Sequence, residues 1–234
     1  MSILFTHAFQ PIIDLKNREI FAYEILLRGT GYETAAEIFE QINRNELAAF
    51  DQVNRVSGLA LSARLGIECR INLNFTEGCM ATESDDFVAA TVTAAEHLGL
   101  NKRQLTLEIK ESEFVHDLES SASKVRSFRE QGPAIAIDNF GAGKADLNML
   151  SIIKPDIVKL DMTVLRNIDR NSTNQSIVTS IYNACLDIGI DIIAGGIEST
   201  GEFNYLKNLG IKLFQGFLFA KPCFESLPRA KIPT

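Results

Sequence analysis

Short apolar runs rich in β-branched residues alternate with segments of helical periodicity, and this alternation limits the fold more than any other feature. Eight runs can be identified, at residues 3–13, 19–26, 70–74, 104–109, 134–138, 156–160, 191–194 and 212–215. Helical periodicity is found at residues 34–47, 50–65, 84–99, 117–131, 145–152, 172–188 and 201–209. Eight strands alternating with helices predict an α/β fold, a (β/α)8 TIM-barrel-like architecture.

The first two runs are separated only by a polar turn around residues 16–18, which is too short for a helical crossover. These strands are therefore expected to pair antiparallel, so that the barrel has an antiparallel first strand. The helical stripe Ile177, Ile181, Cys185 and Ile188 is expected to face the core. No linker rich in Pro, Gly or Ser divides the chain, so residues 1–234 are expected to form a single domain.

Composition argues against several classes of function. The net charge of −7 leaves no basic stripe for a nucleic-acid backbone, so no nucleic-acid partner is expected. The amino terminus has no basic leader and the chain has no long apolar stretch, so neither a signal peptide nor membrane association is predicted. Four single cysteines suggest reduced thiols in a cytoplasmic protein, and three isolated histidines argue against a histidine-rich metal centre.

Acidic and amide side chains recur where the predicted strands end, which in a barrel is the mouth that carries the chemistry. They are Glu24, Asn72, Asn74, Glu108 and Asp138, and Lys159 adds a cation to the same rim. Any one of these acids alone could be a solvated loop carboxylate or a helix cap. Several buried like charges need a neutralising partner, and oxygen ligands suit Mg²⁺, Mn²⁺ or Ca²⁺.

Four motifs occur in order: Glu24-Ile25-Leu26-Leu27-Arg28, Asn72-Leu73-Asn74, Leu107-Glu108-Ile109-Lys110-Glu111-Ser112 and Lys159-Leu160-Asp161. They resemble the E-A-L-L-R, N-L-S, L-E-I-T-E-S and K-I-D motifs of the EAL-domain family, the cyclic di-GMP phosphodiesterases. The resemblance covers essentially the whole chain, as a single EAL-like domain. It implies a (β/α)8-like barrel with an antiparallel first strand.

The resemblance also implies roles for individual residues. A first Mg²⁺ or Mn²⁺ ion would be bound by Glu24, Glu108 and Asp138, with one amide from Asn72 or Asn74, a choice that the sequence leaves open. Lys159 would lie beside the attacking water, and Glu111 would brace the loop after Asp138. Contacts with cyclic di-GMP are implied for Gln10, Arg28, Asp161 and Gln215.

Two positions depart from the family pattern. D-D-F-G-T-G is replaced by Asp138-Asn139-Phe140-Gly141-Ala142-Gly143, so an amide stands where the second Asp would be. A-E-G-V-E is replaced by Ala194-Gly195-Gly196-Ile197-Glu198, so a catalytic Glu that also serves the second metal is absent. Glu198, the second acid of the motif, is retained, and with Lys159 it is the catalytic residue that the resemblance implies. The remaining acids suit one divalent ion at most, and the alternative is that no ion binds.

Losing a catalytic component of this kind typically lowers the rate about 10³-fold or more. The chain is therefore expected to bind cyclic di-GMP with little or no hydrolysis. One alternative is an active metal-dependent phosphodiesterase that yields linear pGpG, with Glu198 or Asp161 replacing the lost ligand. Another is a regulator that acts on a protein partner independently of the nucleotide.

The segment after Gly143, residues 144–151, corresponds by resemblance to a family dimer surface, so a homodimer is one expectation. The alternative is an ordinary amphipathic barrel helix with Leu147, Met149 and Leu150 turned inward. No sensory or diguanylate cyclase segment fits in this length. The chain is therefore expected either to stand alone or to be a piece of a longer protein.

Overall fold

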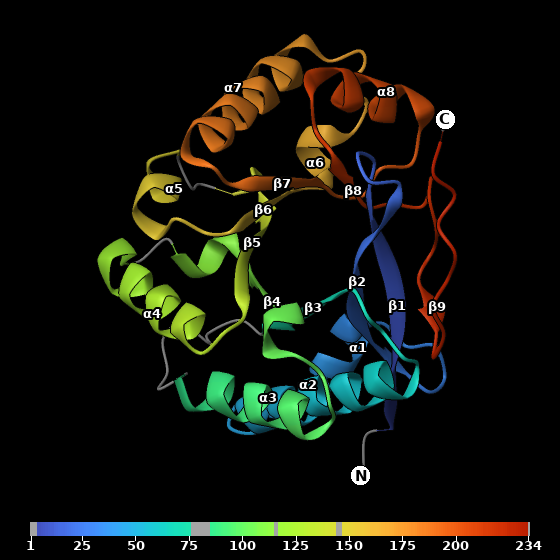
Figure 1. Cartoon of the computed structure of the whole chain (residues 1–234), viewed down its shortest axis with the longest axis vertical. Helices are drawn as coiled ribbons and strands as arrows, with labels where there is room; N and C mark the ends of the chain where they lie inside the picture. Colours follow the sequence, from blue (N-terminus) through green and yellow to red (C-terminus); the bar gives the residue numbers. More distant parts are fainter. Residues whose placement is uncertain (1–3, 76–84, 115–116, 144–146, 234) are drawn as a thin grey trace.

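Strands β1 to β8 close into a barrel in the computed structural model, which describes residues 4–75, 85–114, 117–143 and 147–233. The order is β2-β3-β4-β5-β6-β7-β8-β1, and β1 pairs with β2 to complete the ring (Figure 1). The expected (β/α)8 architecture is confirmed. The bounds are β1 (Phe5–Asp14), β2 (Glu19–Gly29), β3 (Arg70–Phe75), β4 (Leu105–Lys110), β5 (Ala134–Phe140), β6 (Ile157–Leu160), β7 (Asp191–Ala194) and β8 (Leu213–Phe214).

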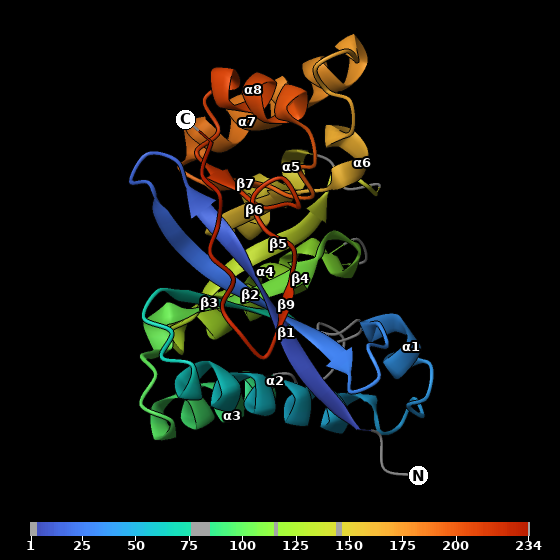
Figure 2. The ribbon, with the colours of Figure 1, turned by 90° about the vertical axis from the view of Figure 1, so that its right-hand side faces the viewer.

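The antiparallel first strand is also confirmed, because β1 runs antiparallel to both β2 and β8. Asp14 holds the turn into β2, where its Oδ1 accepts hydrogen bonds from the backbone N–H groups of Lys16 (2.7 Å) and Asn17 (3.2 Å). An unpredicted strand, β9 (Cys223–Phe224), pairs antiparallel with Ala8 and Phe9 of β1, on the edge that β8 also uses, and the C-terminal segment lies along β1 (Figure 2). Two residues are too few to give a periodic signal.

Helices cover the barrel except along β1, where β9 and the C-terminal segment lie (Figure 1), and the sequence located most of these helices. The prediction at residues 34–47 is wrong, because α1 (Ala35–Phe39) ends early and residues 40–46 are not helical. Reciprocal hydrogen bonds between Thr34 and Glu37 cap this short helix. The others are α2 (Leu47–Arg64), α3 (Asp85–His97), α4 (Leu118–Glu130), α5 (Leu147–Ile153), α6 (Met162–Leu165), α7 (Ser172–Ile188) and α8 (Thr200–Leu209), with 3-10 turns η1 (Lys102–Gln104) and η2 (Glu111–Phe114).

Some of the residues on α7 and α5 that were expected to face the core are exposed. On α7 Ile181 and Cys185 are buried, but Ile177 and Ile188 are 44% and 50% exposed, because the buried face continues through Val178 instead. On α5 Met149 and Leu150 are buried, whereas Leu147 is 41% exposed.

The barrel interior has an apolar floor to which six strands contribute. Its residues are Ile12, Ala22, Ala136, Ile157, Ile193 and Leu213, and a larger apolar layer lies between the strands and the helices. Side chains two positions apart on a strand share a face, so the residues next to this floor decide what lines the mouth. Within the described ranges, none of the helices combines the length and apolar composition needed to cross a bilayer.

Candidate functional site

Polar side chains form a ring one step above the apolar floor. Glu24 follows Ala22 on β2, Asp138 follows Ala136 on β5, and the same two-residue step leads to Lys159 on β6 and Gln215 after β8. On the antiparallel β1 the step runs backwards, from Ile12 to Gln10. At the matching step after Ile193 on β7 stands Gly195, which contributes no side chain to the ring.

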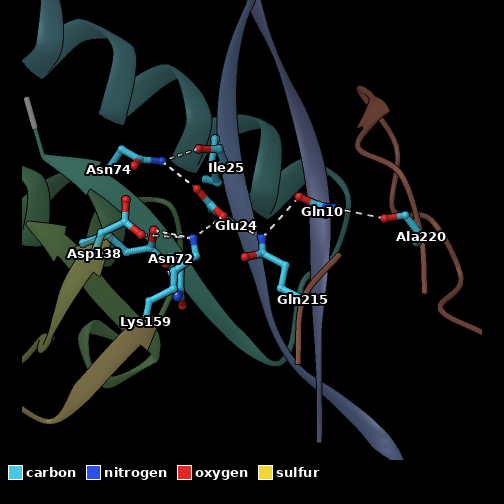
Figure 3. Close-up of polar contacts among 10 residues, drawn as sticks. Gln10, Glu24, Ile25, Asn72, Asn74, Asp138, Lys159, Gln215 and Ala220 are labelled. Carbon is cyan, nitrogen blue, oxygen red and sulfur yellow. Dashed lines mark hydrogen bonds and ion pairs between the residues drawn. The ribbon is translucent and has the colours of Figure 1, made fainter. Parts of the chain in front are cut away.

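Lys159 lies at the centre of the acidic side chains (Figure 3). Its Nζ is 2.7 Å from Glu24 Oε2, 3.0 Å from Glu108 Oε2 and 3.7 Å from Asp138 Oδ1. All four side chains are buried, with at most 8% of each residue exposed. The structure therefore brings together the three carboxylates that the sequence assigned to a metal, around one ammonium group.

This cluster carries more negative charge than Lys159 neutralises. Burial, with the charges of Glu24 and Asp138, raises the pKa of Glu108 to about 8. Burial also raises the pKa of Asp138. Burial opposes ionisation of Glu24 as well, but the Lys159 ammonium and hydrogen bonds outweigh it and lower that pKa. Burial acts to lower the pKa of Lys159, yet the three carboxylates raise it well above its ordinary value, so the lysine is charged.

The two amides of β3 are held differently. Asn72 donates from Nδ2 to Glu108 Oε1 (2.7 Å), while its buried Oδ1 has no hydrogen-bond partner among the described residues. Asn74 donates from Nδ2 to Glu24 Oε1 (3.0 Å) and to the carbonyl of Ile25 (3.4 Å). A buried acceptor without a donor is costly, and a cation would satisfy it. This observation favours Asn72 as the amide ligand.

Two glutamines connect Glu24 to the C-terminal segment (Figure 3). Gln215 donates from Nε2 to Glu24 Oε2 (2.6 Å) and to Gln10 Oε1 (3.3 Å). Gln10 in turn donates to the carbonyl of Ala220 (3.1 Å). Both residues, which the resemblance assigned to the nucleotide, also fix the position of one carboxylate.

A cavity of about 660 Å³ adjoins the cluster at Glu24 and Asn74 and extends toward α1 and the start of α2. Arg28 lines it, half-buried, and donates from Nη1 to the carbonyl of Leu27 (2.7 Å). Three further lining cations, Arg44, Arg55 and Lys110, were missed in the sequence. Lys110 could have been found, because it lies two residues after Glu108 and so shares its face of the strand.

The positions that depart from the family pattern lie beside this cluster. A Cβ on Gly195 would stand 3.6 Å from Lys159 Cγ and 3.1 Å from the carbonyl of Leu160. A side chain at residue 195 would therefore pass directly by Lys159. Asn139 is half-buried on β5 and has a φ of 58°, a conformation that Asn tolerates better than most residues.

The two acids considered as replacements are occupied elsewhere. Asp161 caps α6, where its Oδ1 accepts a hydrogen bond from the backbone N–H of Thr163 (2.7 Å). Glu198 is exposed, and its Oε2 pairs with Arg166 Nη1 at 3.0 Å. Neither carboxylate forms an ion pair with Lys159 in the described part of the chain, and recruiting either would break these contacts.

Glu111, at the start of η2, contacts the loop that follows β5. Its Oε2 accepts a hydrogen bond from the backbone N–H of Gly141 (2.7 Å). A Cβ on Gly143 would collide with Glu111 Oε1, so the loop packs closely on this carboxylate. The arrangement is the one expected of a residue that braces the loop after Asp138.

The donor set suits one hard cation in its chemistry. Three carboxylates and the unpaired Asn72 Oδ1 are the ligands that Mg²⁺ and Mn²⁺ prefer. As they stand, however, the carboxylates turn toward Lys159, and no group of three His, Cys, Asp or Glu side chains within the described ranges is arranged to hold a metal ion.

A family model described as "EAL domain" matches residues 4–222. The blue light- and temperature-regulated antirepressor BluF of Escherichia coli is 28% identical over 97% of this chain and 56% of its own length. The cyclic di-GMP phosphodiesterase PA2567 of Pseudomonas aeruginosa is 28% identical over 92% of this chain and 38% of its own. The chain thus spans about half or less of the length of these curated relatives.

Solved structures share the fold over nearly all of the chain. A standalone versatile EAL protein of Vibrio cholerae in a cyclic di-GMP-bound form is 36% identical, with a TM-score of 0.88, and 99% of this chain and 97% of that chain are covered. A manganese and cyclic di-GMP complex of Klebsiella pneumoniae BlrP1 is 30% identical, with a TM-score of 0.89, and the coverage is 94% and 56%.

Proposed function

Because the chain belongs to the EAL domain family, we propose that it is a cyclic di-GMP receptor that hydrolyses the nucleotide little or not at all. The observation that carries the proposal is the gap at Gly195 beside an otherwise filled polar ring. Asn139 removes a second charge from the same region. The groups that would bind the ligand are retained, and the groups that would serve a second metal are lost.

The cavity supports binding. It adjoins Glu24 and offers Arg28, whose planar guanidinium can contact two phosphate oxygens, together with the apolar side chains of Phe39, Ile42 and Leu47. An apolar pocket with a few placed polar groups is typical of small-molecule sites. The related Vibrio cholerae and BlrP1 chains are described as complexes with cyclic di-GMP.

One Mg²⁺ or Mn²⁺ ion at most is proposed for this site. Glu24, Glu108, Asp138 and Asn72 would hold it. When bound, such an ion neutralises phosphate charge and lowers the pKa of a bound water. A second ion would lack charged ligands, because Asn139 offers only a neutral oxygen and Gly195 offers none.

The remaining residues act in binding and positioning in this proposal. Lys159 and Gln215 contact Glu24 directly, and Gln10 accepts a hydrogen bond from Gln215. Asp161 lies near enough to raise the pKa of Asp138 further. Glu198 is held by Arg166, so we assign it no catalytic role in this chain.

Titration calorimetry with cyclic di-GMP, with Mg²⁺ and in EDTA, followed by HPLC of the same mixtures, tests binding and cleavage together. We expect saturable heat and an unchanged nucleotide. Arg28→Met should weaken binding about tenfold or more, because a charged phosphate contact is lost. Arg126→Met, an exposed arginine on α4, is the matched control and should bind as the wild type does. Turnover near one per second would contradict the proposal.

A second candidate function is suggested by BluF, which is described as an antirepressor. In this alternative the barrel would act by contacting a protein regulator, without needing the nucleotide. Absence of both heat and a thermal shift with cyclic di-GMP would favour it over the receptor.

A further inference from the structure

The acid cluster already holds a cation, the ammonium of Lys159. Two of its carboxylate contacts are at hydrogen-bond distance, 2.7 Å to Glu24 and 3.0 Å to Glu108, and the third, to Asp138, is 3.7 Å. We propose that Lys159 and a divalent cation compete for these three carboxylates, so that a metal ion binds only when Lys159 withdraws. This inference rests on the metal site of the proposed function.

The direction of the carboxylates is the first argument. Each turns an oxygen toward Nζ of Lys159, and as a result no three acidic side chains in the described residues are arranged for a metal. Oxygen ligands of Mg²⁺ or Mn²⁺ must approach the ion to about 2.1 Å, which leaves no room for an ammonium between them. The two cations therefore exclude one another from the cluster centre.

Charge gives the second argument. When all three carboxyl groups are ionised, one ammonium leaves the buried cluster short of positive charge, and Asn72 Oδ1 has no partner in the described structure. A divalent ion would supply one more charge than Lys159 and would satisfy that oxygen as well. Metal binding is thus favourable, but the free energy of releasing Lys159 opposes it.

Gly195 gives the third argument, because it lies beside the stem of Lys159. The Cβ that a larger residue would carry there lies 3.6 Å from Lys159 Cγ and 3.7 Å from its Cε. The missing side chain leaves this flank of the lysine stem uncovered by residue 195. The position that lost a carboxylate is thus also one at which residue 195 places no side chain against Lys159.

Lys159→Met tests the competition without any nucleotide. In EDTA the variant should melt about 10 °C below the wild type, because three buried carboxylates lose their counter-ion. Its affinity for Mn²⁺, measured by electron paramagnetic resonance, should rise about tenfold or more, because a repelling charge a few ångströms away is removed. Mn²⁺ should then raise its melting temperature more than that of the wild type.

Lys102→Met is the control, since Lys102 lies at the surface and its Nζ is 3.9 Å from Glu96 Oε1. Neither the melting temperature in EDTA nor the affinity for Mn²⁺ should change in this variant. Mn²⁺ binding by Lys159→Met that is equal to or weaker than that of the wild type, or absent in both, would overturn the proposal. If Lys159→Met does not fold in EDTA, the Glu108→Gln variant tests the shared site instead. It should fold and bind Mn²⁺ about tenfold more weakly than the wild type does. If Glu108→Gln binds Mn²⁺ as tightly as the wild type does, Lys159 and the metal ion do not share these carboxylates. Cyclic di-GMP titrations of the wild type report the receptor function separately.

Discussion

At the scale of single residues, Gly195 and Asn139 are expected to limit hydrolysis, and restoring both acids should restore it. We expect Asn139→Asp with Gly195→Glu to raise Mn²⁺-dependent turnover of cyclic di-GMP by about 10²-fold or more over the wild type. HPLC of the linear product measures this. The new Cβ would lie 3.1 Å from the carbonyl of Leu160, so the strand end must shift slightly to accept it.

The matched control for this restoration is Asn139→Asp with Gly195→Gln, which adds the same volume at residue 195 without a charge. We expect it to stay inactive. If the acidic double variant binds two Mn²⁺ ions per chain and still fails to cleave, the two losses do not explain the inactivity that we propose.

Glu108 should make stability depend on pH. Its pKa is about 8 in the folded protein against an ordinary 4.5, so the folded state keeps a proton that the unfolded state releases. The free energy of unfolding should therefore fall as pH rises from about 4.5 to about 8, by about 1.4 kcal/mol for each unit of pKa difference at most. Urea denaturation in EDTA should show a flatter profile for Glu108→Gln, and Glu130→Gln, at an exposed site, should follow the wild type.

At the scale of elements, the barrel strands were predictable from their apolar runs, and β2, β5, β6 and β8 each place a polar mouth residue two positions after an apolar floor residue. Ala136 and Asp138 illustrate this pattern. The extent of α1 was not predictable, because Thr34 and Glu37 cap a helix that periodicity alone would extend. The choice between Asn72 and Asn74 depends on partners from β2 and β4, which only the folded barrel brings together.

The contact between η2 and the loop after β5 gives a prediction at this scale. Glu111→Ala should lower the free energy of unfolding by about 1–3 kcal/mol, because the Gly141 N–H loses its acceptor. Glu111→Gln keeps an acceptor oxygen and should lose less. Urea denaturation of both variants measures the difference, and equal stabilities for the two would show that the hydrogen bond does not brace the loop.

At the scale of the whole molecule, the same barrel occurs in relatives of different length. This chain covers 97% of the Vibrio cholerae structure but 56% of BluF, so the fold serves both alone and as part of a larger protein. Along the chain, β5, which carries Asn139, is followed by α5 (Leu147–Ile153), whose Leu147 is exposed.

We propose homodimerisation through α5, and we expect a mass of twice 25.9 kDa at micromolar concentration in light scattering. Leu147 supports this, since an apolar side chain 41% exposed on α5 gains burial at an interface. Leu147→Glu should yield monomers, because a charge would be buried unpaired. Val53→Glu, on α2 and 57% exposed in the wild type, is the control and should remain dimeric. A wild-type mass of one chain would remove the homodimer, and a dimeric Leu147→Glu variant would move the interface away from α5.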